Sequence, residues 1–342
     1  MKAYVNLISD TVTKPDKKMI DYMLNADVGD DVFKEDPTVN KLESMLCSLF
    51  GKESALYFPS GTMANQTAIK IHTQPGDQLI CDHFSHIFNY EGGGVSFNSG
   101  VSCSLIEGER GRIKAEQIEE KINPSDFYHS PRTSLVSIEN TTNKGGGACY
   151  DIRELKEINK LCKKYGFPIH LDGARLWNAM IATDSKPAEY GMIFDTISVC
   201  FSKGLGAPVG SALICSKKNY EKALRIRKIL GGGMRQSGYL AAAAIYGIEN
   251  NWKKLQEDHK KAKDLSKVLL KVKGVKKIYP VETNIIIFEF ENENLKMNFI
   301  KEINNSKIKI ISMDKKKLRM VTHRDYTEEQ HGYVLESLEK LC

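Results

Sequence analysis

The chain has 342 residues, of which 41% are hydrophobic and 27% charged, and its formal net charge is +6. That length is enough for two domains, and no apolar run approaches the roughly 18 residues that a membrane helix needs. Asp10 stands where a signal peptide would have its apolar core, so we expect no export signal and no membrane partner. The 8 cysteines show neither a CxxC pair nor metal-ligand spacing. We therefore predict a cytoplasmic protein without a metal site.

Residues 36–51 carry the clearest helix punctuation in the first part of the chain. Asp36 can cap the helix, Pro37 suits its first turn and Gly51 follows its last residue. Between them an apolar stripe recurs with helical spacing. The pattern predicts an amphipathic helix over this segment.

Strands and helices then alternate up to about residue 216. A strand at 55–58 leads into a helix that opens near Thr62, and Asp151 with Glu154 has the spacing of a capping box. Further strands are predicted at 134–138, 168–172, 196–201 and 210–216. This alternation indicates an α/β fold with a mostly parallel central sheet wrapped by helices. In such sheets, ligands bind beyond the carboxyl ends of the strands.

The last part of the chain has a different pattern. A long helical stretch over 236–270 is followed by a strand at 283–290, a hairpin over 308–322 and a final helix that starts at Thr327. This order predicts a smaller α+β domain at the C-terminus. We divide the chain into an N-terminal arm (1–25), a large cofactor-binding domain (26–248) and a small C-terminal α+β domain (249–342).

Lysines are concentrated in this last part, notably over 259–277. A nucleic-acid surface would need arginine and aromatic side chains interleaved on one face. Here the lysines lie on the polar side of a helical pattern whose other side is Leu265, Val268 and Leu269. We favour a solvated helix face, and we expect no nucleic-acid partner.

Three polar groups fall at the carboxyl ends of predicted strands. Asp172 ends one strand, Lys203 follows another, and Ser60-Gly61-Thr62 precedes a helix. Taken singly, each has an ordinary explanation: a turn or cap for the aspartate and the Gly-Thr pair, a surface position for the lysine. Together they match what pyridoxal phosphate needs, which is an amine for its aldehyde, a carboxylate for its ring nitrogen and N–H groups for its phosphate. A lysine that leaves a buried strand is suited to the amine.

Nine motifs then occur in order: "ISDTVTKP", "GDDVFKEDPTVNKLE", "PSGTMAN", "SHIFNYEGGG", "SIENTTN", "HLDGAR", "SKGLGAPVGS", "GGGMRQSG" and "LRMVTH". They span residues 8–323, and the set closely resembles the L-type, low-specificity threonine aldolases. These enzymes belong to the aspartate-aminotransferase-like, fold type I enzymes that use pyridoxal 5′-phosphate. Related β-eliminating lyases share part of the set.

The resemblance implies a role for each matching residue at the cofactor. Lys203 would carry the cofactor, Asp172 would face its ring nitrogen, and Gly61 and Thr62 would bind its phosphate. His86 matches the histidine that stacks on the ring. From the residues alone, His86 could equally be a core histidine.

The resemblance also implies substrate-binding residues. Ser9, Arg175 and Arg319 match positions that hold the substrate carboxylate, and Arg175 also lies near the cofactor. Arg319 sits in a strand pattern, so from the residues alone it could equally point to solvent. His129 matches a second active-site histidine, although its flanking residues differ.

Some matches are weaker, and some positions depart from the family pattern. Lys228 and Arg235 flank the "GGG" loop and resemble positions near the phosphate or a neighbouring subunit. Ile8 stands where the family often has arginine, Thr142 where many members have histidine, and Lys34 with Glu35 replaces a Gly-acid pair. The loop "GGGACYD" also departs from the pattern. Neither Lys203 nor Asp172 is affected.

Three functions remain open at this stage. The first is aldol cleavage of L-threonine or L-allo-threonine to glycine and acetaldehyde, with His86, His129 or a water as base. The second is β-elimination or racemisation on the same fold, with pyruvate and ammonia as the elimination products. The third is a cofactor-free nucleic-acid-binding protein. We favour the first, acting on a small amino-acid substrate in a homo-oligomer, expected to be a homotetramer built as a dimer of dimers, with shared active sites.

Overall fold

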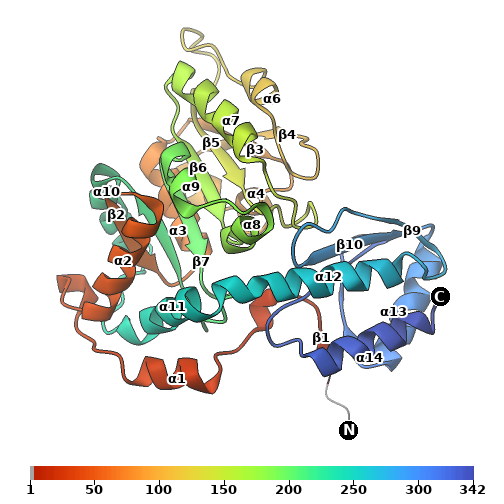
Figure 1. Cartoon of the computed structure of the whole chain (residues 1–342). Coiled ribbons are helices and arrows are strands. Elements are labelled where there is room, and N and C mark those ends of the chain that lie inside the picture. The colour runs from red at the N-terminus through yellow and green to blue at the C-terminus, as the bar shows by residue number, and fades with distance from the viewer. Residues whose placement is uncertain (1–3) are drawn as a thin grey trace.

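The computed structural model describes residues 4–342. A seven-stranded sheet lies at the centre of the larger part, with strand order β2-β8-β7-β6-β5-β3-β4 (Figure 1). The strands β4, β3, β5, β6 and β7 run parallel to one another, and β8 is antiparallel to both of its neighbours. The prediction of an α/β fold with a mostly parallel sheet is confirmed. The strands are β2 (Ser54–Phe58), β3 (Gln78–Asp82), β4 (Ser102–Ile106), β5 (Thr133–Glu139), β6 (Ile169–Gly173), β7 (Thr196–Cys200) and β8 (Ser211–Cys215).

Helices cover both faces of this sheet because its strands are apolar on both sides. Alternate residues of a strand face opposite ways: Tyr57 packs into the core beneath α2, and Phe58 packs beneath α3. The first face carries α2 (Pro37–Phe50), α6 (Ala115–Glu119), α7 (Ile152–Tyr165), α8 (Leu176–Thr183), α9 (Pro187–Ile193) and α11 (Gly238–Asn250). The second carries α3 (Gly61–His72), α5 (Gly94–Ser99) and α10 (Lys217–Ile229). Short α4 (His86–Asn89) follows β3.

The caps read from the sequence are present in the structure. Asp36 accepts hydrogen bonds from the first turn of α2, and Gly51 ends that helix in the left-handed conformation. Asp151 and Glu154 form the predicted capping box of α7. These caps fix where the helices begin and end, and so where the loops at the sheet edge start.

The C-terminal part is built on a second sheet, of order β12-β13-β10-β9, with antiparallel neighbours. It contains β9 (Val275–Ile278), β10 (Ile285–Phe290), β12 (Ile311–Ser312) and β13 (Lys317–Val321), with α12 (Leu255–Leu269), α13 (Glu293–Asn305) and α14 (Glu328–Glu339) packed on it. The predicted hairpin and the final capping box are confirmed. The domain boundaries themselves stay a prediction.

The N-terminal segment joins the two parts. Its first strand, β1 (Val5–Asn6), pairs in parallel with β11 (Ile308–Lys309) of the C-terminal part. The chain then forms a 3-10 turn (Asp10–Val12) and α1 (Lys17–Leu24), which packs on α11. The segment therefore carries residues 9–12 to the carboxyl edge of the large sheet. A second 3-10 turn spans Asp31–Phe33.

The long helix predicted over 236–270 is wrong in one respect, because the structure breaks it. Between α11 and α12 lies a 3-10 turn, Trp252–Lys254. Asn251 is buried there and its side-chain amide donates to the carbonyl of Leu205, 2.9 Å away. The Trp252 indole donates to the carbonyl of Trp177. These tertiary contacts turn the chain where the apolar periodicity alone continues the helix.

Lys34, which replaces a glycine of the family pattern, has a backbone conformation that favours glycine. Lys34 has a φ of 64°, in the left-handed region that costs a side chain about 1 kcal/mol. Its ammonium lies 3.0 Å from the carboxylate of Glu43 and over the ring of Tyr220. Lysine thus holds the turn with side-chain contacts that glycine would lack.

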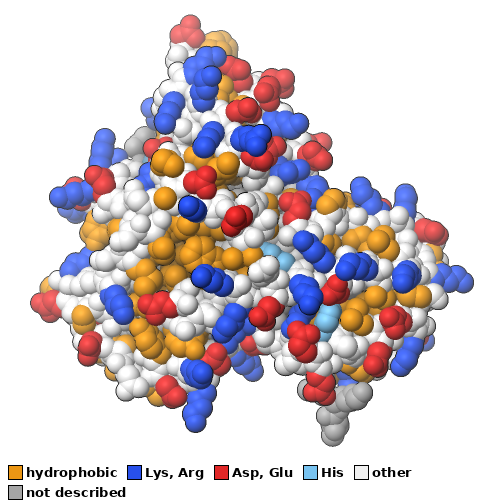
Figure 2. Space-filling view, in the orientation of Figure 1, with side chains coloured by type: hydrophobic (Ala, Val, Ile, Leu, Met, Phe, Trp, Pro, Cys, Tyr) orange, Lys and Arg blue, Asp and Glu red, His pale blue; other side chains and the backbone are white. Residues whose placement is uncertain are grey.

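None of the helices described in residues 4–342 is long and apolar enough to cross a membrane. On the face shown in Figure 2, basic and acidic side chains are interspersed, with apolar side chains between them.

Candidate active site

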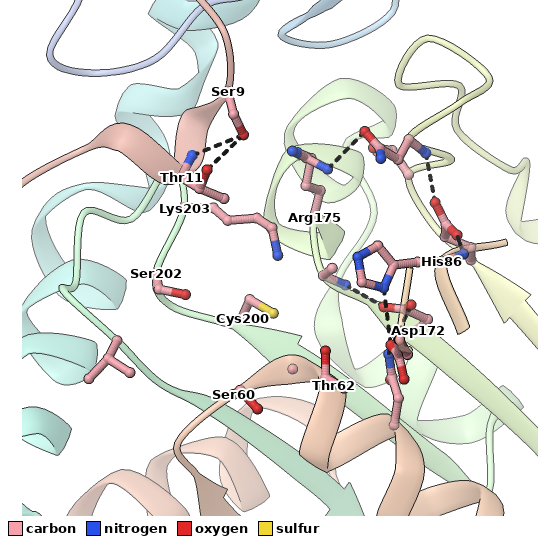
Figure 3. Close-up of a pocket in the computed structure, with 18 of the residues that line it drawn as sticks. Ser9, Thr11, Ser60, Thr62, His86, Asp172, Arg175, Cys200, Ser202 and Lys203 are labelled. Atoms are coloured by element: carbon pink, nitrogen blue, oxygen red, sulfur yellow. Dashed lines mark hydrogen bonds and ion pairs between the residues drawn. The ribbon is translucent and has the colours of Figure 1, made fainter. Parts of the chain in front are cut away.

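The carboxyl ends of β2, β3, β5, β6 and β7 meet at one edge of the large sheet, because these strands are parallel. A cavity of about 420 Å³ lies there, closed on one side by the N-terminal segment and on another by β13. Its volume is in the usual range for a small-ligand site. Figure 3 shows the cavity. Of the predicted site residues, it is lined by Ser9, Gly61, Thr62, His86, Asp172, Arg175, Lys203 and Arg319.

Lys203 reaches the cavity from the loop between β7 and β8. This loop is tight: the Phe201 amide donates to Gly210, and the Gly206 amide donates to the Lys203 carbonyl at 2.8 Å. Thr13 of the N-terminal segment donates to the same carbonyl. The backbone of Lys203 is therefore fixed, and its half-buried side chain extends into the middle of the cavity (Figure 3).

Asp172 lies at the end of β6, and strand alternation turns it away from the core. Its neighbour Leu171 packs in the core, whereas Asp172 faces α3. One carboxylate oxygen accepts from the Asn65 side chain at 3.0 Å, and the other accepts from the Ala174 amide at 3.1 Å. The carboxylate is 2% exposed, so its orientation is set by these two donors.

The N-terminus of α3 offers an anion site. Ser60 caps the helix by accepting from the Met63 amide, while the amides of Gly61 and Thr62 belong to the first turn, where no intrahelical acceptor exists. A Cβ on Gly61 would lie 2.7 Å from the sulfur of Cys200. The glycine thus keeps the backbone open at this end of the cavity, and a phosphate group fits there.

His86 begins α4, and its ring borders the cavity. Its backbone amide donates to Glu139 at 2.7 Å, and its Nδ1 lies 3.0 Å from the carboxylate of Glu91. Burial alone would lower the pKa of His86, but the hydrogen bond to Glu91 and the nearby carboxylates of Asp172 and Glu139 raise it above the usual range. The ring is thus held at the cavity wall by a charged partner.

Arg175 forms a buried ion pair with Asp10. Its Nε and Nη2 donate to the two carboxylate oxygens of Asp10 at 2.8 and 2.7 Å, and both side chains are buried. Burial would raise the pKa of Asp10, but the Arg175 guanidinium lowers it to about 2. The Asp10 carboxylate thus covers the Nε–Nη2 side of the guanidinium, and Nη1 lies 3.5 Å from the Asn143 side-chain oxygen. The remaining N–H groups of Nη1 and Nη2 can still contact a ligand carboxylate at the other end of the guanidinium.

Arg319 does not point to solvent, although its strand pattern allowed that. Nη1 donates to Asn143 at 2.8 Å and Nη2 donates to the Ile8 carbonyl at 3.1 Å. Nε is buried and has no hydrogen-bond partner among residues 4–342. Burial, together with the Arg175 guanidinium, lowers the pKa of Arg319 to about 10. The negative charge of an anion in the cavity would offset the repulsion between the two guanidinium groups. This pair of arginines therefore fits a carboxylate ligand.

Ser9 lines the cavity but already has a local partner. Its hydroxyl accepts from the Thr11 amide and hydroxyl, and so caps the 3-10 turn. The same hydroxyl makes only a long contact as a donor, 3.5 Å to the Asp10 carboxylate, so its proton can turn to a ligand while it accepts these bonds.

The structure places three predicted residues outside this cavity. His129 lies in the loop before β5, at the amino-terminal edge of the sheet, where its ring contacts Phe127 and Tyr128. The loop before a parallel strand lies opposite the site, so His129 does not reach the cavity of its own chain. Lys228 and Arg235 are exposed near the "GGG" loop, and Arg235 pairs with Asp30 at 2.7 Å.

The cavity also holds polar residues that the sequence reasoning did not assign. They include Asn65, Glu91, Glu139 and Asn143. Glu139 accepts from the amides of His86 and Asn143, and thereby ties two loops together. Burial, and next the Asp172 carboxylate, raise the pKa of Glu139 to about 7. In the sequence, these unassigned cavity residues could have been recognised as polar residues that lie inside a motif or on an otherwise apolar helix face.

The pocket therefore fits the group that the sequence predicted, pyridoxal phosphate. It joins an amine, a buried carboxylate and an open helix N-terminus in one cavity. At the other side, the guanidinium of Arg319 lines the same space. Lys203, Asp172 and the first turn of α3 would hold the cofactor, and Arg319 would hold an acidic ligand beside it.

Comparison with known proteins gives one consistent relationship. Residues 6–293 match the β-eliminating lyase family. The chain is 40% identical to low-specificity L-threonine aldolase 1 of Arabidopsis thaliana, over 97% of this chain and 94% of that protein. It is 37% identical to the low specificity L-threonine aldolase of Escherichia coli K12, over 95% and 96%. The solved structure of Leishmania major threonine aldolase superposes with a TM-score of 0.85 at 24% identity, covering 98% and 99% of the two chains. The chain belongs to the β-eliminating lyase family, among the low-specificity L-threonine aldolases.

Proposed function

We propose that this protein is a pyridoxal-phosphate-dependent lyase that cleaves L-threonine and L-allo-threonine to glycine and acetaldehyde. The observation that carries the proposal is the single cavity that joins Lys203, Asp172, the first turn of α3 and Arg319. Family membership and the relatives at 37–40% identity support the reaction class. When bound, pyridoxal phosphate supplies an electron sink for the pair of electrons left by the broken Cα–Cβ bond.

The residues of this chain divide the remaining work. Arg319 would hold the substrate carboxylate, which fixes the bond at Cα that stands perpendicular to the cofactor ring. Asp172 would keep a proton on the ring nitrogen through its buried charge. His86 is the imidazole that lines the cavity and would accept the proton of the β-hydroxyl, directly or through a water. Lys203 would anchor the cofactor and carry a proton to the product.

A product assay tests the reaction itself. Purified protein with pyridoxal phosphate is expected to convert L-threonine and L-allo-threonine to equal amounts of glycine and acetaldehyde. Release of a 2-oxo acid and ammonia in their place would indicate β-elimination, and conversion of L-threonine to D-allo-threonine without cleavage would indicate racemisation at Cα. Either result would contradict the proposal.

We expect Arg319→Lys to lower kcat/KM by about 10²-fold or more while the absorbance of the bound cofactor is kept. Lysine offers one point charge, which cannot contact Asn143, the Ile8 carbonyl and a substrate carboxylate together. Steady-state assays with L-threonine measure the loss. The matched control is Arg225→Lys, at an exposed position of α10, and it should behave like the wild type. Equal kinetics for the two variants would contradict the role of Arg319.

We also propose that the active enzyme is a cytoplasmic homotetramer, built as a dimer of dimers. The 8 cysteines are all free, which suits a reducing compartment. The segment 29–36 packs on 231–238 through the Asp30–Arg235 ion pair and the Gly238 amide, which donates to Asp36. Beside these contacts, Phe33 is 69% exposed, as an interface residue of one subunit would be.

Light scattering at working concentration tests the assembly. We expect a mass of four times the 38.5 kDa chain, and we expect Phe33→Asp to shift the protein to smaller, less active species. An active monomer would contradict the proposal.

A further inference from the structure

Glu91 is a fully enclosed acid of the cavity wall, with a side chain that is 0% exposed. A carboxylate in that position must be matched by donors. Two N–H groups donate to it, that of Asn65 at 2.9 Å on one oxygen and that of Gln66 at 2.6 Å on the other. His86 Nδ1 lies 3.0 Å from the oxygen that Asn65 contacts. Glu91 is therefore the common partner of two side chains of α3 and of the imidazole.

Hydrogen bonds to the side-chain oxygens of Gln66 and Asn65 fix the orientation of both side-chain amides. Asn98 donates to the Gln66 oxygen at 3.2 Å, which leaves the Gln66 nitrogen for Glu91. Ser198 and His170 lie 2.6 and 3.1 Å from the Asn65 oxygen, which leaves the Asn65 nitrogen as donor. Asn65 and Gln66 therefore each direct an N–H group at Glu91, which accepts both bonds.

Asn65 also links this network to the carboxylate proposed for the ring nitrogen. The same nitrogen that donates to Glu91 donates to Asp172 at 3.0 Å. One amide group therefore sets the position of two carboxylates. Burial lowers the pKa of His170 to about 4, so this ring is neutral at pH 7 and can serve as a donor to Asn65.

The "EGGG" sequence explains how the chain makes room for this arrangement. Gly92 and Gly93 have φ of 63° and 74°, in the left-handed region. A Cβ on Gly94 would lie 2.7 Å from the side-chain carbonyl carbon of Gln66. Glycine at these positions lets the loop turn sharply and lets Gln66 approach Glu91.

We propose that Glu91 is the positioning residue of His86: it holds a proton on Nδ1 and so leaves Nε2 as the ring nitrogen that faces the reacting atoms. The proposal rests on the function proposed above and adds to it a residue that acts through His86. A carboxylate behind an imidazole fixes both the tautomer and the plane of the ring. Asn65 and Gln66 fix the carboxylate in turn.

The charges around His86 come from several elements. Glu91 follows α4 and Glu139 ends β5. Asp172 lies on β6, and Lys203 extends from the loop after β7 (Figure 3). The Tyr90 ring lies 5.6 Å from the imidazole. Glu91 alone makes a side-chain hydrogen bond to the ring among residues 4–342, so its effect can be separated from that of the other two acids.

The direct test is the ¹⁵N NMR spectrum of the histidine rings in the holoenzyme, with His86 assigned by the His86→Gln variant. Above the pKa of His86 we expect a protonated Nδ1 and an unprotonated Nε2. A neutral ring protonated on Nε2 would overturn the proposal. This readout needs no turnover and no Glu91 variant, so it remains decisive if a variant does not fold.

The second test replaces the charge with a neutral side chain of the same shape. In Glu91→Gln we expect the pKa of His86 to fall by about 1 unit or more, kcat to fall about 10-fold or more, and the acid limb of the kcat profile to move to lower pH. Glu120→Gln, an exposed position beside α6, is the matched control. An unchanged His86 pKa in Glu91→Gln would overturn the proposal. Failure of the wild type in the product assay would overturn the reaction but not the NMR result.

Discussion

Lys203→Ala is expected to abolish turnover, by about 10⁴-fold or more, because it removes both the anchor of the cofactor and a positioned proton carrier. The variant should still bind pyridoxal phosphate through the first turn of α3 and Asp172. It should lose the borohydride-reducible bond between the cofactor and the protein. Absorbance spectra before and after borohydride, followed by peptide mapping, measure this loss.

Three further measurements test whether Lys203 itself carries the cofactor. In the wild type, the reduced cofactor should map to the peptide that contains Lys203. A small primary amine added to Lys203→Ala should restore part of the rate, because it supplies the missing amine. Lys301→Ala, exposed on α13, should match the wild type. A reduced adduct on another lysine of the variant would contradict the assignment.

Local signals predicted most of the large-domain fold. The caps at Asp36, Gly51 and Asp151 are interactions between residues two to four positions apart, so they can be read directly from the chain. The break between α11 and α12 could not be read in this way, because it depends on contacts of Asn251 and Trp252 with Leu205 and Trp177. The antiparallel direction of β8 could not be predicted from local signals either. It results from the loop around Lys203, which turns the chain back so that β8 pairs with β7.

In the site too, the positions of some residues follow from local sequence, whereas their side-chain partners lie far away along the chain. Lys203, Asp172 and Gly61 follow strands, and parallel strands bring their carboxyl ends together. The side-chain partners of these residues come from elsewhere: the Asp10–Arg175 pair joins residues 165 positions apart. The sequence could place Arg175 in the cavity, but could not show that Asp10 covers the Nε–Nη2 side of its guanidinium.

The departures from the family pattern leave the cavity intact. Thr142 points away from it, and its hydroxyl donates to the Arg110 carbonyl at 2.8 Å. Ile8 contributes to the site through its carbonyl, which accepts from Arg319. A backbone group does this work whichever side chain the residue has. Both positions can therefore differ from the family without loss of the ligand contacts that we propose.

Asp172→Asn is expected to lower kcat by about 10²–10³-fold, the range seen when a positioned electrostatic partner is removed. The ring nitrogen of the cofactor would lose the negative charge that keeps it protonated, and each unit of pKa lost there corresponds to about 1.4 kcal/mol. The structure adds a second cost. Asp172 accepts from Asn65 on one oxygen and from the Ala174 amide on the other, so an asparagine must direct its own N–H groups at one of these donors.

The two effects can be separated with a cofactor whose ring charge is permanent. Reconstitution of Asp172→Asn with N-methyl pyridoxal phosphate should restore a large part of kcat, because the analogue needs no carboxylate to stay charged. The cofactor Kd and the Tm of the variant report the lost hydrogen bonds, and they should not recover in the same proportion. Asp184→Asn, at an exposed position with a φ of 53°, is the matched control. A rate that the analogue leaves unchanged would mean that Asp172 acts through packing alone, and a wild-type rate in Asp172→Asn would remove its role altogether.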